Sequence, residues 1–233
     1  MLFNSFEFLF FLPIVFILYW FVFKKIQSQN IFILIASYVF YGWWDWKFLG
    51  LIFLSTIIDY TIGILLSKTK PIKKRKYLLW FSLLFNLGIL GFFKYYNFFI
   101  DNWIDAWSNL GISMNKSSLN IILPVGISFY TFQTLSYSID VYRNKLEPTK
   151  NFIAFASFVS FFPQLVAGPI ERATNLLPQF YKKRNFDYDL AISGIKLILW
   201  GLFKKIVIAD NCAIYVNEIF MTKVNFVIHI QQI

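Results

Sequence analysis

Four long apolar runs constrain the fold of this chain more than any other feature of its sequence. They cover residues 6–23, 31–44, 48–67 and 77–93, and polar or basic residues bound each of them. A helix that crosses a bilayer needs about 20 mainly apolar residues. Three of the runs are long enough, and the run 31–44 becomes long enough when its ends are extended slightly. Charged residues make up only 15% of the chain, against roughly 25% in soluble domains, so the sequence predicts a multi-pass integral membrane protein built from α-helices.

The basic residues orient these runs. The segment KTKPIKKRK (68–76) lies between two of them, and Lys and Arg accumulate on the cytoplasmic side of membrane proteins. With this segment inside, Lys24 and Lys25 also lie inside, the N-terminus lies outside, and the aromatic cluster GWWDWKF (42–48) reaches the outer interface. The first run lacks the basic flank and cleavage site of a secretory signal, so we expect a retained helix. We predict an inner (cytoplasmic) membrane protein with 94–118 as an external or interfacial segment.

The stretch LPVGISFYTFQTLSYSIDVYR (123–143) keeps polar side chains within apolar surroundings. A Pro and a Gly near its start allow a helix to begin or bend there. Gln133 and Asp140 should face the interior of a bundle, because lipid cannot satisfy an amide or a carboxylate. Arg143 either extends to the cytoplasmic interface or pairs with Asp140, three residues earlier on the same helix face.

The second half of the chain departs from a simple alternation of spans. Basic residues flank the run 152–167 on both sides, and Pro163, Gly168 and Pro169 interrupt its far end. We therefore expect a re-entrant segment that enters the membrane, breaks and returns to the same side. Such irregular backbone is tolerated only where protein or a water-filled cavity surrounds it. The later run 191–208 carries apolar residues at helical spacing, and its pattern leaves open whether it spans the membrane or lies shallow in it.

Ionisable residues within apolar segments are costly and are therefore candidates for function. Asp59, in LSTIIDYTIG, either lines a pathway or hydrogen-bonds a neighbouring helix and fixes packing. Asp140 and Arg143 suit a structural pair at the inner boundary. Glu171 and Arg172 follow the expected break and either bind a ligand or pair locally. The candidate polar lining comprises Asp59, Gln133, Asp140, Arg143, Gln164, Glu171 and Arg172.

No arrangement of residues in the sequence indicates a catalytic or metal centre. The single His, His229, lies in the final stretch NFVIHIQQI and has the context of an incidental residue. The single Cys, Cys212, excludes an internal disulfide framework and gives no metal-ligand spacing. We predict no metal ion and no bound cofactor. The net charge of +10 follows from membrane orientation, and no folded basic surface with base-contacting groups indicates nucleic-acid binding.

Four stretches nevertheless resemble one family. They are MLFNSFEFLFFLPIVFILYW followed by SYVFYGWWDWKFLGLIFLSTIIDY, then LPVGISFYTFQTLSYSIDVYR, then FVSFFPQLVAGPIERATNLLPQF, and finally WGLFKKIVIADNCAIYVNEIF. Together they resemble the membrane-bound O-acyltransferase family, and within it the alginate O-acetylase branch. The resemblance covers residues 1–222, which we expect to be the N-terminal part of one membrane domain, a multi-helix bundle with a re-entrant segment. Residues 223–233 are expected to form a divergent tail.

The resemblance implies an O-acetyltransferase that modifies an exported polysaccharide such as alginate or another cell-envelope glycan. An activated acyl donor, such as acetyl-CoA or an acyl carrier, would reach a polar tunnel from the cytoplasmic side. A His would act there as general base on the attacking hydroxyl, and a low-dielectric tunnel would exclude water. Periplasmic or extracellular acetyl-transfer proteins are the implied partners, beside the lipid bilayer.

The chain departs from this family in length. Family members are roughly twice as long, and their further half carries the catalytic His. His229 does not stand in that motif, so the catalytic role is not transferred to it. We expect an incomplete chain, from a truncated or frameshifted reading frame, that transfers no acyl group by itself. The alternative function is a transporter, or a non-catalytic membrane partner of an envelope-modifying complex, with Asp59 and Asp140 in an ion or solute path.

Overall fold

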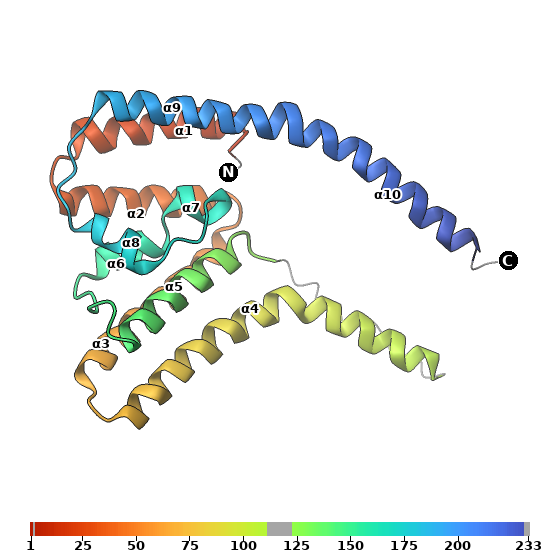
Figure 1. Ribbon diagram of the computed structural model, residues 1–233, viewed down its shortest axis with the longest axis horizontal. Helices are drawn as coiled ribbons and strands as arrows, with labels where there is room; N and C mark the ends of the chain where they lie inside the picture. The colour runs from red at the N-terminus through yellow and green to blue at the C-terminus, as the bar shows by residue number, and fades with distance from the viewer. Residues whose placement is uncertain (2, 111–122, 231–233) are drawn as a thin grey trace. The chain divides into compact units, whose positions relative to one another are not determined.

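The computed structural model describes residues 1, 3–110 and 123–230, and within them every regular element is a helix (Figure 1). This confirms the expected all-α class. The chain divides into two compact units, one of Met1 with Val15–Lys183 and one of Leu2–Ile14 with Arg184–Ile233. Two helices, Trp46–Lys68 and Ile72–Asn109, are long and apolar enough to cross a membrane, which agrees with the membrane environment that the sequence predicts.

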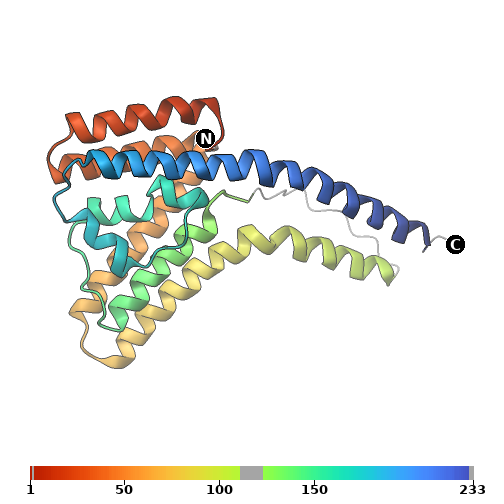
Figure 2. The same cartoon turned by 45° about the horizontal axis from the view of Figure 1, so that its top comes forward.

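The first unit is built on three neighbouring helices, α3 (Leu49–Lys68), α4 (Ile72–Asn109) and α5 (Ile127–Tyr142), which lie side by side (Figures 1 and 2). Helix α5 is the central one, since ten of its sixteen residues are buried. Helix α4 buries only Ser82, Asn86 and Leu90 along its 38 residues. Its remaining surface is rich in exposed Leu, Phe and Trp, as expected of a helix whose solvent is lipid.

Helix α4 differs from the expectation at its C-terminal half. The sequence pattern places a boundary at Lys94, but the helix continues without interruption to Asn109. No Pro occurs in this stretch, so nothing prevents the backbone hydrogen bonds from continuing. The rings of Trp103 and Trp107 lie 5.7 Å apart, as their spacing of four residues in a helix predicts. The rest of the expected interfacial segment, 111–118, lies outside the described residues.

The remainder of the first unit packs around these helices. The connection from α2 (Ile26–Gly42) to α3 contains a 3₁₀ turn, Trp46–Phe48, which Asp45 caps by accepting a hydrogen bond from the Lys47 N–H at 2.9 Å. Helices α6 (Phe152–Val159) and α7 (Phe162–Ala167) contact α2 and α5. They are followed by α8 (Ala173–Leu176) and a 3₁₀ turn, Leu177–Phe180.

The segment that contains α6, α7 and α8 leaves one end of α5 and comes back to it. Near its start, the Thr149 N–H donates to Tyr137 Oη at 3.2 Å. Farther along, the Leu165 carbonyl lies against Gly126 at the opposite end of α5. On the return path the Ala173 N–H donates to Ser136 Oγ at 3.2 Å. The hydroxyls of Thr149 and Tyr181 then hydrogen-bond to each other, which closes the hairpin.

The break at the tip of this hairpin has a local cause. Helix α6 ends at Val159, and the next helix begins with Pro163 in its first turn, where a missing N–H costs nothing. The Phe162 N–H is satisfied by Ser37 Oγ of α2 at 3.2 Å, so the freed backbone is not left unpaired. The sequence therefore identified the interruption correctly, although it placed the break near Pro163 and Gly168 and did not foresee its partner in α2.

The second unit contains the start of α1 (Phe6–Ile17) and the helices that close the chain. Helix α9 (Tyr188–Phe203) begins where Asp187 Oδ1 accepts a hydrogen bond from the Leu190 N–H at 3.0 Å. It continues through a π-helical turn, Lys204–Ala209, into α10 (Asp210–Ile230). The predicted helix over 191–208 is confirmed, and it forms part of a longer one.

Candidate functional site

Asp59 is the centre of a buried polar cluster that joins α3, α4 and α5. Its side chain is fully buried. Its Oδ1 accepts hydrogen bonds from Ser82 Oγ at 2.5 Å and Ser138 Oγ at 2.8 Å, and its Oδ2 accepts one from Asn86 Nδ2 at 2.8 Å. These donors replace the water that a carboxylate requires. No cation pairs with Asp59 within the described part of the chain.

A second layer of hydroxyl groups holds Asn86 in place. Asn86 Oδ1 accepts hydrogen bonds from Ser55 Oγ of α3 at 2.9 Å and from Thr134 Oγ1 of α5 at 3.3 Å. Both carboxylate oxygens of Asp59 and both ends of the Asn86 amide are therefore engaged. This geometry supports the packing interpretation of Asp59, in which one residue fixes three helices. A pathway through Asp59 stays a prediction.

Sequence reasoning missed the partners of Asp59. Ser82 and Asn86 stand four residues apart in the apolar run 77–93 and share one helix face. Two small polar residues on one face of an otherwise apolar helix are a signal for a buried polar contact. That signal was present in the sequence, but it does not name the helix on the other side.

The polar residues around the hairpin do not converge on one centre. Gln133 is buried, and its Nε2 donates to the Phe158 carbonyl at 2.6 Å, so it satisfies the end of α6. Gln164 is buried in α7 at the tip. Glu171 Oε2 accepts a long hydrogen bond, 3.4 Å, from Asn175 four residues later. Arg172 is exposed. Glu171 therefore pairs locally, which was one of its two predicted alternatives, and its partner is Asn175.

The Asp140–Arg143 pair that the sequence predicts is wrong. No hydrogen bond or ion pair joins these two residues, and Asp140 Oδ2 is buried without a hydrogen-bond partner within the described part of the chain. Helix α5 ends at Tyr142, so Arg143 already follows the last helical residue. A spacing of three residues brings side chains together only inside a helix, and Arg143 instead extends into solvent.

Arg75, rather than Arg143, is the arginine that contacts the C-terminal end of α5. Its guanidinium donates to the Leu66 carbonyl at 2.7 Å, to the Tyr142 carbonyl at 2.7 Å and to Asn144 Oδ1 at 2.9 Å. It therefore caps the C-terminal ends of α3 and α5 together, where a positive charge also complements the helix dipoles. From the sequence alone, Arg75 had only a topological role, as one of six basic residues in 68–76.

Replacing Arg75 by Lys should lower the free energy of unfolding by about 1–2 kcal/mol, because an ammonium group cannot reach three acceptors in this forked arrangement. The measurement is the denaturant or thermal unfolding midpoint of the detergent-purified chain. Lys74 is exposed in the same segment, so Lys74→Ala is the control and should stay within about 0.5 kcal/mol of the parent. Equal stability of Arg75→Lys and the parent would contradict the capping role.

A second group of buried polar atoms lies where α5 begins. Gly126 has a φ of +76°, and a Cβ added to it would stand 2.7 Å from the Leu165 carbonyl oxygen of α7. Tyr41, at the end of α2, donates its hydroxyl to the Val125 carbonyl. Tyr130 is 1% exposed, and its hydroxyl has no hydrogen-bond partner within the described part of the chain. An unsatisfied buried hydroxyl costs about 1–3 kcal/mol.

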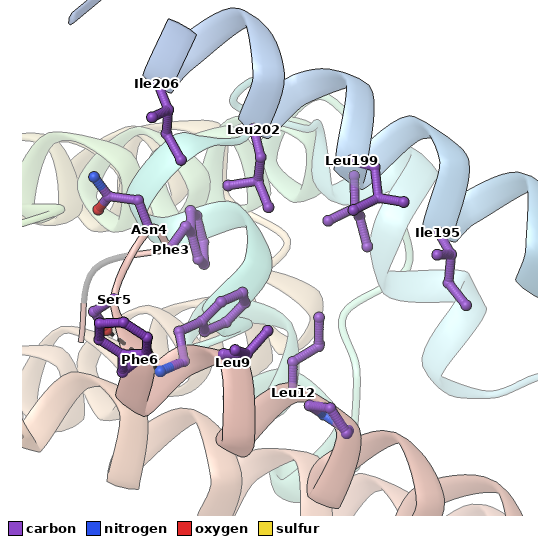
Figure 3. Close-up of a pocket in the computed structure, with 13 residues that line it drawn as sticks. Phe3, Asn4, Ser5, Phe6, Leu9, Leu12, Ile195, Leu199, Leu202 and Ile206 are labelled. Atoms are coloured by element: carbon purple, nitrogen blue, oxygen red, sulfur yellow. Dashed lines mark hydrogen bonds between the residues drawn. The ribbon is translucent and has the colours of Figure 1, made fainter.

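The second unit holds an apolar cavity of about 420 Å³ (Figure 3). Helix α9 contributes Ile195, Leu199 and Leu202 to one wall, and the π-helical turn after it contributes Ile206. The polar residues Asn4 and Ser5 lie at the Ile206 end. Ser5 Oγ already accepts a hydrogen bond from the Phe8 N–H at 3.3 Å. The walls therefore suit apolar groups and offer no acid–base chemistry. His229 belongs to α10, and its side chain is not among those that the structure describes.

The residues that the structure describes contain no group of three His, Cys, Asp or Glu side chains that could hold a metal ion.

Comparison with known proteins shows which proteins the chain is similar to. The chain is 40% identical over 225 residues to a probable alginate O-acetylase AlgI of Pseudomonas syringae pv. tomato, and 39% identical over 223 residues to that of Pseudomonas aeruginosa. Each alignment covers 94% of this chain and 42% of the relative. The peptidoglycan O-acetyltransferase of Helicobacter pylori is 34% identical, over 91% of this chain and 45% of its own length.

The chain is similar to part of proteins named alginate O-acetylase and peptidoglycan O-acetyltransferase, in agreement with its resemblance to the membrane-bound O-acyltransferase family. It spans less than half the length of these acyltransferases. No protein-family model matches the chain. No solved structure matches it either. The likeness to these relatives therefore rests on identity over 91–94% of the chain.

Proposed function

We propose that the chain forms part of an O-acetyltransferase that transfers acetyl groups to an exported polysaccharide, such as alginate or another cell-envelope glycan. The observation that carries this proposal is the identity of 34–40% to proteins named alginate O-acetylase or peptidoglycan O-acetyltransferase. The donor would be an activated acetyl group, on acetyl-CoA or an acyl carrier. Acetyl-transfer proteins outside the membrane would be partners of the assembled enzyme.

The chain alone is proposed to be inactive. Acyl transfer to a hydroxyl needs a general base within hydrogen-bond reach of that hydroxyl, and the family resemblance places the catalytic His in a region that this chain does not match. Within the described side chains, the buried titratable groups are Asp59, Asp140 and tyrosines. Asp59 already accepts three hydrogen bonds, so it is poorly placed to accept a proton from a substrate.

The test is acetyl transfer in membranes from cells that express the chain alone or together with the DNA that follows it at its locus. We expect labelled acetyl groups to reach polysaccharide only when the downstream sequence supplies the His-bearing region. Transfer by the 233-residue chain alone would refute the proposed inactivity. Membranes without transfer in either case, although both polypeptides are present, would refute the function itself.

We also propose that the chain is multi-pass in the inner membrane, with its N-terminus outside and with α6 and α7 as a re-entrant segment. The support for re-entry is the hairpin itself, since Thr149 and Tyr181 meet at one end of α5 while Leu165 lies at the other. One freed backbone group at its tip, the Phe162 N–H, donates to Ser37 Oγ of α2. That is the condition under which broken helices occur at membrane depth.

Cysteine labelling tests this orientation. In a Cys212→Ser background, which removes the single exposed thiol, Lys73→Cys should react with an impermeant maleimide only after the cells are permeabilised. Lys47→Cys, in the aromatic cluster at the opposite interface, is the matched control and should react in intact cells. Both positions are exposed, so access decides the result. Labelling of Lys73→Cys in intact cells would reverse the proposed topology.

A further inference from the structure

Three tyrosines are buried in the described part of the first unit, and they differ in how their hydroxyls are used. Tyr41 donates to the Val125 carbonyl, and Tyr137 Oη accepts a hydrogen bond from the Thr149 N–H at 3.2 Å. Tyr130 is as deeply buried as the others, yet its hydroxyl has no partner among the described residues. A phenylalanine would fill the same space without burying an unsatisfied polar atom. The hydroxyl is therefore best explained by a ligand that accepts its hydrogen bond.

The surroundings of Tyr130 favour an oxygen that carries partial negative charge. Tyr130 lies in the first turn of α5, and its N–H bonds the Gly126 carbonyl at 3.2 Å. Side chains of a helix tilt toward its N-terminus, and at that end of α5 the Tyr41 hydroxyl bonds the Val125 carbonyl just before the helix. The unused donor thus lies at the positive end of the α5 dipole, which attracts anions and polarised carbonyls and disfavours cations.

The backbone packs closely where α5 begins. Gly126 adopts a positive φ there, and the Leu165 carbonyl of the hairpin tip comes so close that no side chain fits between them. The broken helix α6–α7 comes close to this point, and membrane proteins confine such irregular backbone to protein-lined or water-filled passages. A buried donor, a helix N-terminus and a broken helix therefore meet at one position, near the beginning of α5.

We propose that the Tyr130 hydroxyl donates a hydrogen bond to the carbonyl oxygen of the acyl group being transferred. This inference rests on the proposed function and adds a donor-side binding residue to it. Tyr130 forms and breaks no covalent bond. When a hydroxyl oxygen attacks the acyl carbon, the C=O electron pair moves to the carbonyl oxygen, and the hydrogen bond from Tyr130 strengthens as that oxygen becomes negative. The proton of the attacking hydroxyl passes to the general base that the family resemblance implies. The electron pair returns when the C–S bond breaks, and the departing thiolate takes up that proton from the base.

The test compares Tyr130→Phe with Tyr137→Phe, two substitutions that remove one hydroxyl from equally buried positions of the same helix. The first measurement is the unfolding temperature of the purified chain in detergent, with and without a small acetyl thioester, S-acetyl-N-acetylcysteamine. Tyr130→Phe should leave the unfolding temperature unchanged or raise it and should abolish the increase that the thioester causes. Tyr137→Phe should lower the unfolding temperature by several degrees, because it strands the Thr149 N–H, and should retain the thioester effect.

The second measurement is acetyl transfer from labelled acetyl-CoA in membranes that contain the chain with its downstream sequence. Tyr130→Phe should reduce transfer at least about tenfold per folded protein, and Tyr137→Phe should stay within about twofold. If wild-type membranes transfer acetyl groups and Tyr130→Phe transfers equally well, this inference fails while the proposed function stands. If wild-type protein neither transfers acetyl groups nor responds to the thioester, both fail. A loss of stability in Tyr130→Phe that matches Tyr137→Phe would assign the hydroxyl a structural role and overturn the inference.

Discussion

Replacing Asp59 by Ala is expected to lower the free energy of unfolding by about 3 kcal/mol. The substitution leaves Ser82, Asn86 and Ser138 without the acceptor that they share, and each stranded donor in a low-dielectric interior costs a substantial part of its desolvation energy. Asp59→Asn should lose about half as much, because it keeps the volume and one acceptor oxygen. The measurement is unfolding of the detergent-purified chain with increasing denaturant.

Asp105→Ala is the matched control for the Asp59 variants. Asp105 is a carboxylate on α4 that is exposed, so its removal should change the free energy of unfolding by less than about 0.5 kcal/mol. A fall of similar size in both variants would mean that the cluster contributes nothing specific. If Asp59→Ala is as stable as the parent, the packing role is contradicted and a pathway through this residue is favoured.

Replacing Gly126 by Ala should cost about 2–4 kcal/mol, for two separate reasons. The positive φ is unfavourable for any residue with a Cβ, and the new methyl group would lie 2.7 Å from the Leu165 carbonyl oxygen, a backbone atom that cannot rotate away. The expected result is a lower unfolding temperature together with easier proteolysis of the hairpin 149–181, whose tip must shift. Limited proteolysis in detergent, followed by mass spectrometry, locates the change.

Gly88→Ala provides the contrast for Gly126→Ala. Gly88 lies inside α4, and a Cβ there would meet no atom within 4 Å. The same chemical change should therefore stabilise the chain by about 0.5–1 kcal/mol, because alanine loses less backbone entropy in a helix. Two Gly→Ala substitutions with opposite signs would separate the local demand at Gly126 from a general effect of added methyl groups. Destabilisation of equal size in both would argue against a special backbone at Gly126.

The predicted polar lining shows how much of the candidate site can be predicted from the sequence alone. The sequence identified Asp59 and Gln133 as interior residues correctly, because both interrupt apolar helix faces where lipid offers no partner. It could not choose between a pathway and a packing role for Asp59, since that choice depends on how many donors surround the carboxylate. Those donors come from α4 and α5, at sequence separations of 23 to 79 residues. Spacing rules do not extend across such distances.

The error at Asp140 and Arg143 has the same origin. A separation of three residues predicts contact only while the helix continues, and α5 ends one residue too early. The arginine that does cap this helix is Arg75 of α4, which lies 67 residues before Tyr142 in the sequence. Tyr130 is the opposite case, since its sequence neighbours mark it only as an ordinary aromatic core residue. Its proposed role follows from its buried hydroxyl, to which no described residue offers a hydrogen bond.

The sequence by itself determined the helical class, the apolar runs, the break after α6 and the resemblance to O-acyltransferases, because each of these follows from local composition or from order along the chain. The tertiary structure alone decided which donors engage Asp59, which arginine caps α3 and α5, and which buried hydroxyl of α5 is left unused. The physical reason is that a hydrogen bond requires its two atoms to lie about 3 Å apart. Only the packing of helices that are distant in sequence sets those separations.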